Sequence, residues 1–381
     1  MSKPVPVFSL LDQDDRDQMK SLIETAYQQA GTAARHERSA VAVEAPGEEA
    51  EDTGGLVNGE PLKLPPFDDL IGIDASVYRQ VEAAVNSGKQ HLMFYGPPGT
   101  GKTTLARLVS GVLNGRKWVL ITGSADWSSQ DIIGGYPPLA NGAVKFYPGV
   151  LLQNFDRPLI IDELNRCDID KVIGPLFTVL SGQATTLPYR TDVADADSPQ
   201  YQILPEWKEN PAAHEFAPGT AWRLIATINS IDKASLYQMS YALSRRFGWI
   251  YVDAPRDTAG FVRTFVEKIL KDEVGPIGGI PPIAAIWDAV NLVRTIGPAP
   301  VIDALKSIRI MEPAADLLGA PVGDLKIAYL DAFDLFFLPI LDGILRHEAE
   351  GIVTAVIAAL GLEPESVEAT GLGRRVLSIA V

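Results

Sequence analysis

The sequence predicts an α/β protein with a parallel-sheet core and a helical C-terminal domain. Three observations lead to this. A glycine-rich turn separates an apolar run from a segment with helical spacing, a second apolar run ends in two acidic residues, and helical periodicity dominates beyond Pro255. We divide the chain into an N-terminal helix (1–33), an acidic flexible linker (34–64), the α/β core (65–254), and a helical domain with its tail (255–381).

Composition narrows the class of protein. The 381 residues are enough for two or three domains, and the net charge of −15 disfavours sequence-independent binding to the phosphates of nucleic acid. A single cysteine, Cys167, excludes an internal disulfide and disfavours a cysteine-based zinc site. Neither a secretory signal nor an apolar run of membrane-spanning length is visible, so we expect a soluble, cytoplasmic protein with no membrane partner.

The N-terminal part reads as one helix and a linker. Residues 8–29 have amphipathic helical spacing. Acidic residues with no basic ones fill the stretch from Glu44 to Glu60, a composition that suits a flexible linker. The ordered body should begin near Pro65, and a helix is expected over 75–87.

The glycine-rich turn is a phosphate-binding loop. It follows the apolar run 91–95, precedes the helical segment 105–113, and fits the pattern G-x-x-x-x-G-K-[ST]. Glycines let backbone N–H groups approach phosphate oxygens, a lysine reaches the outer phosphates, and the next hydroxyl binds Mg²⁺. The residues of this site are Gly96, Pro97, Pro98, Gly99, Thr100, Gly101, Lys102, Thr103 and Thr104.

Ile71 and Ile73 lie just before the first core strand. In many proteins with a phosphate-binding loop this segment lines the pocket for the nucleotide base, so base contacts are expected here. Simple packing of a domain-entry turn is the other interpretation, and both stay open.

A second strand, 118–122, is followed by a loop rich in glycine, proline and aromatic residues, 127–138, and by a candidate hairpin through 143–147. Such loops either face a substrate or pore or serve as structural turns.

The apolar strand 159–161 ends in Asp162 and Glu163, which is a Walker B element. Asp162 is placed to hold Mg²⁺, and Glu163 to polarise the water that attacks the γ-phosphate. Asn165 and Arg166 follow and can reach that water or a neighbouring subunit.

A helix is expected over 173–180 and a polar surface excursion over 185–220. The strand 222–229 ends in Asn229, which can orient the attacking water. Arg245 and Arg246 precede a fifth strand, 249–252.

These motifs, in this order, resemble the helix-2-insert branch of the AAA+ ATPases, which includes MoxR-like, dynein-related and McrB-like proteins. The McrB-like group is the most similar. The resemblance covers about 67–254, and its most specific segments are 131–136, 161–166, 229–233 and 242–247.

The resemblance implies a five-stranded parallel sheet in the order 5-1-4-3-2 with a small helical lid. It also implies a hexameric ring with ATP and Mg²⁺ between subunits, where Arg245 or Arg246 of one subunit reaches the γ-phosphate held by the next. GTP stays open as the nucleotide, because the McrB-like group includes GTP users.

The sequence departs from this family at two places. Ala299 stands where relatives often carry the sensor II arginine, so that role is absent or moved to Arg294 or Arg309. The N-terminal segment does not resemble a DNA-reading domain, so target selection would fall to a partner and direct binding of nucleic acid stays open.

Beyond the core we expect helices over 261–272, 282–294, 301–309 and 325–345, whereas 353–360 and 374–379 suggest no role.

Two classes of function follow. The first is a Mg²⁺-dependent ATPase ring that remodels or translocates a macromolecule, either as the motor of an effector nuclease or as a MoxR-like chaperone acting on a client protein. The second is a nucleotide-dependent assembly switch with slow hydrolysis, which the missing sensor II arginine favours.

Overall fold

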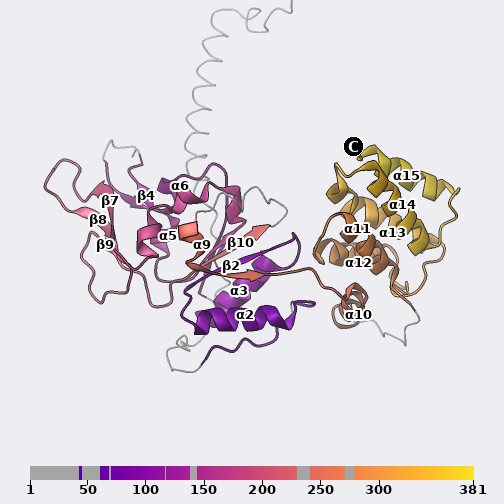
Figure 1. Cartoon of the computed structure of the whole chain (residues 1–381), viewed down its shortest axis with the longest axis horizontal. Coiled ribbons are helices and arrows are strands. Elements are labelled where there is room, and N and C mark those ends of the chain that lie inside the picture. Colours follow the sequence, from indigo (N-terminus) through magenta and orange to yellow (C-terminus); the bar gives the residue numbers. More distant parts are fainter. Residues whose placement is uncertain are drawn as a thin grey trace, which may run out of the picture.

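The computed structural model describes residues 43–44, 61–67, 70–115, 117–137, 144–229, 241–270 and 279–381. An α/β body built on the central sheet and an all-helical body formed by the C-terminal elements lie side by side (Figure 1). The helix expected over 8–29 and most of the expected linker lie outside the described residues.

The central sheet has the strand order β1-β3-β6-β10-β2-β11. All neighbours in it are parallel except β1, which pairs antiparallel with β3. Numbered along the chain, the five parallel strands stand in the order 2-3-4-1-5, which confirms the predicted 5-1-4-3-2. The strands are β1 (Val43–Glu44), β2 (His91–Gly96), β3 (Val119–Thr122), β6 (Leu159–Asp162), β10 (Leu224–Asn229) and β11 (Phe247–Tyr251).

Both faces of this sheet are covered, as the continuous apolar strands require. On one face Leu92 and Phe94 pack with α2 (Ala75–Asn86) and α3 (Lys102–Leu113). On the other face Met93 packs in a cluster with four short helices, α4 (Ser129–Ile132), α5 (Val150–Gln153), α6 (Ile169–Ile173) and α7 (Leu176–Val179). Because parallel strands end at one edge, the residues after β2, β6 and β10 meet there.

The expected surface excursion, 185–220, contains a small sheet of its own. Strands β7 (Thr185–Arg190), β8 (Gln200–Ile203) and β9 (Glu215–Phe216) pair in that order. Aromatic packing explains why this segment forms strands: the ring centroid of Phe146 lies 4.5 Å from that of Tyr201 and 5.1 Å from that of Tyr189. The candidate hairpin is seen as β5 (Tyr147–Pro148) pairing with β4 (Gly134–Gly135).

Two expected helices are each interrupted at a proline. The segment 173–180 is divided between α6 and α7 at Pro175, and 325–345 is divided between α13 (Asp324–Phe336) and the 3-10 helix η3 (Leu338–Leu341), which contains Pro339. Proline has no N–H to donate to the preceding turn, which is why the helices end there.

The helical body has one core, in which Trp287 and Tyr329 are fully buried. Each finds a partner for its polar atom, the Trp287 indole N–H with the Ile296 carbonyl at 3.0 Å and the Tyr329 hydroxyl with the Leu317 carbonyl at 3.0 Å. The remaining helices are α10 (Thr258–Lys268), α11 (Pro282–Val293), α12 (Ala299–Met311), α14 (Arg346–Leu360) and α15 (Val367–Ser378). The segments 353–360 and 374–379 therefore lie in α14 and α15 and supply part of this core.

None of the helices in the described part of the chain is long and apolar enough to cross a lipid bilayer.

His91, the first residue of β2, makes folding stability depend on pH. Its side chain is 5% exposed, its Nδ1 accepts a hydrogen bond from the Leu224 N–H at 3.0 Å, and burial, with Arg223 nearby, lowers its pKa from 6.5 to about 3. Protonation therefore favours the unfolded chain, so the free energy of unfolding should fall as pH drops below 6.5, by roughly 1.4 kcal/mol per unit.

We expect His91→Gln, which keeps an acceptor but does not titrate, to be less stable than the natural chain at pH 7 and to lose less stability between pH 7 and pH 5. Denaturant unfolding at both pH values measures the difference. His347→Gln, at an exposed position of α14, is the control and should follow the natural chain. Equal losses in the His91→Gln variant and the natural chain would contradict the role assigned to His91.

Candidate functional site

The phosphate loop turns from β2 into α3 through glycines with positive φ. Gly101 has φ 83° and caps the N-terminus of α3. Gly96 has φ 152°, and a Cβ there would lie 2.1 Å from the Val252 carbonyl oxygen, so no side chain fits. The glycines are therefore needed for the loop to pass close to its neighbours while its N–H groups stay available to phosphate.

Lys102 is the first residue of α3 and is 5% exposed. Its Nζ donates to the carbonyls of Gly96 at 3.1 Å and Pro97 at 2.6 Å. Burial lowers the pKa of Lys102 to about 8, although Asp162 and Glu163 act in the opposite direction. A buried ammonium held by neutral carbonyls gains from a nearby polyanion, so this lysine is suited to bind phosphate oxygens.

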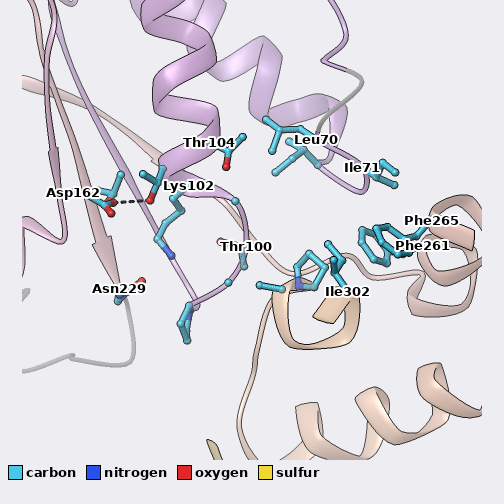
Figure 2. Close-up of a pocket in the computed structure, with 18 of the residues that line it drawn as sticks. Leu70, Ile71, Thr100, Lys102, Thr104, Asp162, Asn229, Phe261, Phe265 and Ile302 are labelled. Atoms are coloured by element: carbon cyan, nitrogen blue, oxygen red, sulfur yellow. Dashed lines mark hydrogen bonds between the residues drawn. The ribbon is translucent and has the colours of Figure 1, made fainter. Parts of the chain in front are cut away.

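Asp162, at the end of β6, receives two hydroxyl hydrogen bonds. Its Oδ1 accepts from Thr103 Oγ1 at 2.6 Å and from Thr227 Oγ1 at 2.5 Å. A dashed line in Figure 2 marks a hydrogen bond at Asp162. A carboxylate and a hydroxyl from the phosphate loop are hard oxygen donors, the kind that Mg²⁺ uses together with phosphate oxygens and water. These two residues therefore fit a Mg²⁺ ion bound with a nucleotide.

Thr227 is a site residue that was not predicted from the sequence. It is 1% exposed, donates to Asp162, and accepts a hydrogen bond from the Glu163 N–H at 2.9 Å. It lies two residues before Asn229, so both side chains are on the same face of β10. That alternation was a signal that could have identified it.

Glu163 is held in an unusual backbone conformation, with φ 51° and ψ 48°. Among the described residues it is the one residue other than glycine with positive φ, a conformation that costs free energy and clusters at functional sites. Gly123, after β3, makes room for it: a Cβ at Gly123 would lie 2.4 Å from the Glu163 carbonyl oxygen. The sequence therefore places a strained residue directly after Asp162, at the edge of the sheet where the site lies.

Two side chains fix the Glu163 carboxylate. Asn229 Nδ2 donates to Oε1 at 3.3 Å, and Arg166 Nε forms an ion pair with Oε2. Arg166, which was expected to reach either the attacking water or a neighbouring subunit, therefore binds the carboxylate of its own chain. The group that is expected to act on water is positioned by one amide and restrained by one cation.

A cavity of about 520 Å³ joins these groups to the helical body. Figure 2 shows Lys102, Asp162 and Asn229 on one side, with Phe261, Phe265 and Ile302 opposite. The lining residues from the α/β body are Leu70, Ile71, Ile73, Pro98, Gly99, Thr100, Gly101, Lys102, Thr103, Thr104, Asp162, Glu163, Thr227 and Asn229. The helical body contributes Phe261, Phe265, Ile269, Pro298, Ala299, Ile302 and Lys306.

One end of this cavity is apolar. Ile71 and Ile73 line it as expected, and they are joined by Phe261 and Phe265, whose rings are stacked at 6.4 Å between centroids. The aromatic pair was missed because helical spacing in α10 shows only that the two residues share a face. An apolar, aromatic end next to a phosphate loop is suited to a nucleotide base.

The helical body is bonded directly to the phosphate loop. The Gly297 N–H donates to the Pro98 carbonyl at 2.8 Å, and the Ala299 N–H donates to the Gly99 carbonyl at 3.2 Å. A Cβ at Gly297 would lie 2.2 Å from the carbonyl carbon of Gly99, so the two backbones touch. A shift of the phosphate loop would therefore move the start of α12.

The structure does not bring every expected residue to the cavity. Arg294 donates to the carbonyls of Ile340 and Asp342, and Arg309 donates to that of Pro313 at 2.6 Å. Neither lines the cavity, so the expectation that one of them replaces the sensor II arginine is wrong. Both satisfy carbonyls near helix ends within their own body.

Arg245 and Arg246 also lie outside the cavity of their own chain. Arg246 donates to Ser181 Oγ at 2.7 Å. Arg245 is exposed, its backbone carbonyl accepts a hydrogen bond from Lys89 Nζ at 2.9 Å, and its backbone N–H donates to the Tyr241 carbonyl at 3.3 Å. Within the described residues the Arg245 guanidinium itself has no hydrogen bond or ion pair, so it is the freer of the two.

Comparison with known proteins gives one family match. Residues 91–247 match the family described as AAA domain (dynein-related subfamily). The McrB subunit of the type IV methyl-directed restriction enzyme of Escherichia coli K12 is 27% identical over 194 residues, which cover 47% of this chain and 39% of that protein. The RuvB subunit of the Holliday junction branch migration complex of Desulfosudis oleivorans is 34% identical over 105 residues, 26% of this chain and 29% of that one.

The chain thus spans less than half of the length of these two curated relatives. Among solved structures, the Thermotoga maritima RuvB branch migration motor is similar with a TM-score of 0.42 and 17% identity, covering 84% of this chain and 90% of that one.

Proposed function

We propose that this protein is a Mg²⁺-dependent ATPase that works as a ring, because residues 91–247 match the family described as AAA domain (dynein-related subfamily) and the chain is similar to the McrB subunit. Hydrolysis would drive the remodelling or translocation of a macromolecule. The observation that carries the proposal is the cavity, in which the phosphate loop, the Thr103–Asp162 oxygen pair and the positioned Glu163 carboxylate face one space.

We propose a role for each group on the basis of this geometry. Lys102 would leave the loop carbonyls and bind the β- and γ-phosphates, while Thr103 and Asp162 would hold the Mg²⁺ that neutralises phosphate charge. Glu163 would take a proton from the attacking water, whose oxygen bonds to the γ-phosphorus as the bond to the β–γ bridging oxygen breaks. Asn229 would keep the Glu163 carboxylate and that water in line.

A second copy of the chain would complete the site. Among the described residues, no arginine lines the cavity, whereas Arg245 is exposed elsewhere on the α/β body. An arginine supplied in trans stabilises the charge of the phosphoryl transition state. We therefore propose a ring, with six subunits as the family resemblance implies, in which Arg245 of one subunit reaches the nucleotide of the next.

A protein partner would give the ring its target. The McrB relative is a subunit of a restriction enzyme, and we propose by analogy an effector such as a nuclease, acting in the cytoplasm. A client of a MoxR-like chaperone is the alternative partner. GTP is the alternative nucleotide, because among the described residues the apolar end of the cavity is lined by Ile71, Ile73, Phe261 and Phe265, none of which can hydrogen-bond to a base through its side chain.

Two features of the site favour a second function, a nucleotide-dependent assembly switch. Ala299 brings no charge to the nucleotide, and Arg166 restrains Glu163 by an ion pair. Both features would slow hydrolysis, so a nucleotide-dependent assembly switch is the second candidate.

We expect the purified protein to release phosphate from ATP or GTP with Mg²⁺ and to gain mass in solution when nucleotide is present. Lys102→Ala should lose both properties because it removes the cation that binds the phosphates. Phosphate release and light scattering on the same samples measure this.

Lys117→Ala is the matched control, since Lys117 is exposed, lies in the same body and does not line the cavity. Tight binding and assembly without release would favour the switch. If the natural chain neither bound nucleotide nor released phosphate, both functions would be contradicted.

A further inference from the structure

The wall that the helical body contributes to the cavity has a single charged side chain among the described residues, Lys306 of α12. The α/β body contributes the other charged groups: Lys102, Asp162 and Glu163. A bound nucleoside triphosphate with its metal would still carry net negative charge, and a cation on the opposite wall of the cavity would complement that charge.

Lys306 lies on the face of α12 that starts at the phosphate loop. Ala299, Ile302 and Lys306 all line the cavity, and their spacing of three and four residues places them in one row along the helix. Ala299 is bonded through its N–H to Gly99, so this row begins at the loop. The Lys306 backbone is roughly 10 Å further along the axis, and helical side chains lean towards the N-terminus, that is, back towards the loop.

Lys306 is also free to bind a ligand. It is exposed, and in the part of the chain that the structure describes its ammonium makes no hydrogen bond or ion pair. The two arginines of the same body that the sequence suggested for the sensor II role, Arg294 and Arg309, are bonded to carbonyls away from the cavity. A solvated lysine on a four-carbon stem can reach a phosphate without rearranging the helix.

We propose that Lys306 is a nucleotide-binding residue that places a positive charge on the phosphate chain from the side of the helical body. This rests on the proposed function and deepens it: the charge that Ala299 cannot supply comes from two turns further along the same helix. Because Lys306 and Lys102 belong to different bodies, a polyphosphate between them draws the helical body towards the phosphate loop.

The test compares the affinities of the full chain for a non-hydrolysable ATP analogue and for ADP, each with Mg²⁺, at two salt concentrations. Lys306→Ala should weaken binding of the triphosphate by about tenfold and of the diphosphate by less. It should also lower the dependence of affinity on salt, because one ionic contact is lost. Lys306→Arg should have the triphosphate affinity and the salt dependence of the natural chain, whereas Lys306→Gln should lack the salt dependence.

The control is Lys268→Ala, which removes an exposed lysine from α10 of the same body, at a position that does not line the cavity. It should leave both affinities unchanged. The proposal is overturned if Lys306→Ala binds the triphosphate as the natural chain does, or if its loss is equal for both nucleotides, which would indicate a contact to the base or ribose. A natural chain that binds no nucleotide would overturn the proposed function as well, whereas a natural chain that binds nucleotide beside a Lys306→Ala variant with unchanged triphosphate affinity would overturn this inference alone.

Discussion

Replacing Glu163 by glutamine is expected to leave nucleotide binding intact and to lower phosphate release by at least about 100-fold. The amide has nearly the shape of the carboxylate and still accepts the Asn229 hydrogen bond, so the cavity should keep its form. It cannot take a proton from water, and it loses the ion pair with Arg166. Equilibrium binding and single-turnover phosphate release, measured on the same preparation, separate the two effects.

Glu206→Gln is the matched control, because Glu206 is exposed and does not line the cavity. The base role of Glu163 would be wrong if its glutamine variant released phosphate at the natural rate. Arg166→Ala tests the role of the ion pair. Phosphate release faster than in the natural chain would show that the ion pair restrains Glu163 rather than orients it.

Arg245→Ala is expected to lower turnover by about 1,000-fold or more while nucleotide binding by each subunit is kept. The reason is geometric, since Arg245 lies outside its own cavity and is exposed, so it can act only on the site of another copy. Turnover and binding of the variant, at concentrations where the natural chain assembles, measure the effect.

A mixing experiment tests the shared site directly. Lys102→Ala lacks a working phosphate loop and Arg245→Ala lacks the arginine, so each variant alone should be inactive. Mixed in equal amounts before nucleotide is added, they should recover activity at roughly a quarter of the interfaces, where an intact loop meets an intact arginine. The mass of the mixture in solution shows whether the two variants assemble together; a mixture that assembles but is as inactive as its parts would contradict a site shared between subunits.

Arg246→Ala is the control for the choice between the arginines. Arg246 is bonded to Ser181 within its own chain, so its loss should act mainly on local structure. If Arg246→Ala, and not Arg245→Ala, recovered activity on mixing with Lys102→Ala, the assignment of the two arginines would be reversed.

Local sequence rules were sufficient for the phosphate loop. The residues around Gly96 and Gly101 need backbone conformations that only glycine adopts easily, and the flanking apolar run and helix follow from spacing alone. The strand-terminal positions of Asp162 and Asn229 were predictable for the same reason. Once the strands are parallel neighbours, their ends converge, and the predicted strand order is confirmed by the sheet.

Local rules were insufficient where an outcome depends on partners distant in the chain. The surface excursion carries strands because its aromatic residues pack on Phe146, about forty residues upstream of the nearest one, and polar composition hides that contact. The helix over 325–345 was too long because its apolar pattern continues past Pro339 while the hydrogen bonding does not.

Short, local patterns were enough to predict a phosphate loop, a Walker B pair and a strand-terminal asparagine on one parallel sheet. The residues that close the site could be identified only once the folded chain was known. Thr227 and Arg166 bind the acidic pair, Phe261 and Phe265 form the apolar end, and Lys306 rather than Arg294 or Arg309 is on the opposite wall. The physical reason is that burial and charge pairing depend on how the two bodies meet, and no local pattern in the chain records that contact.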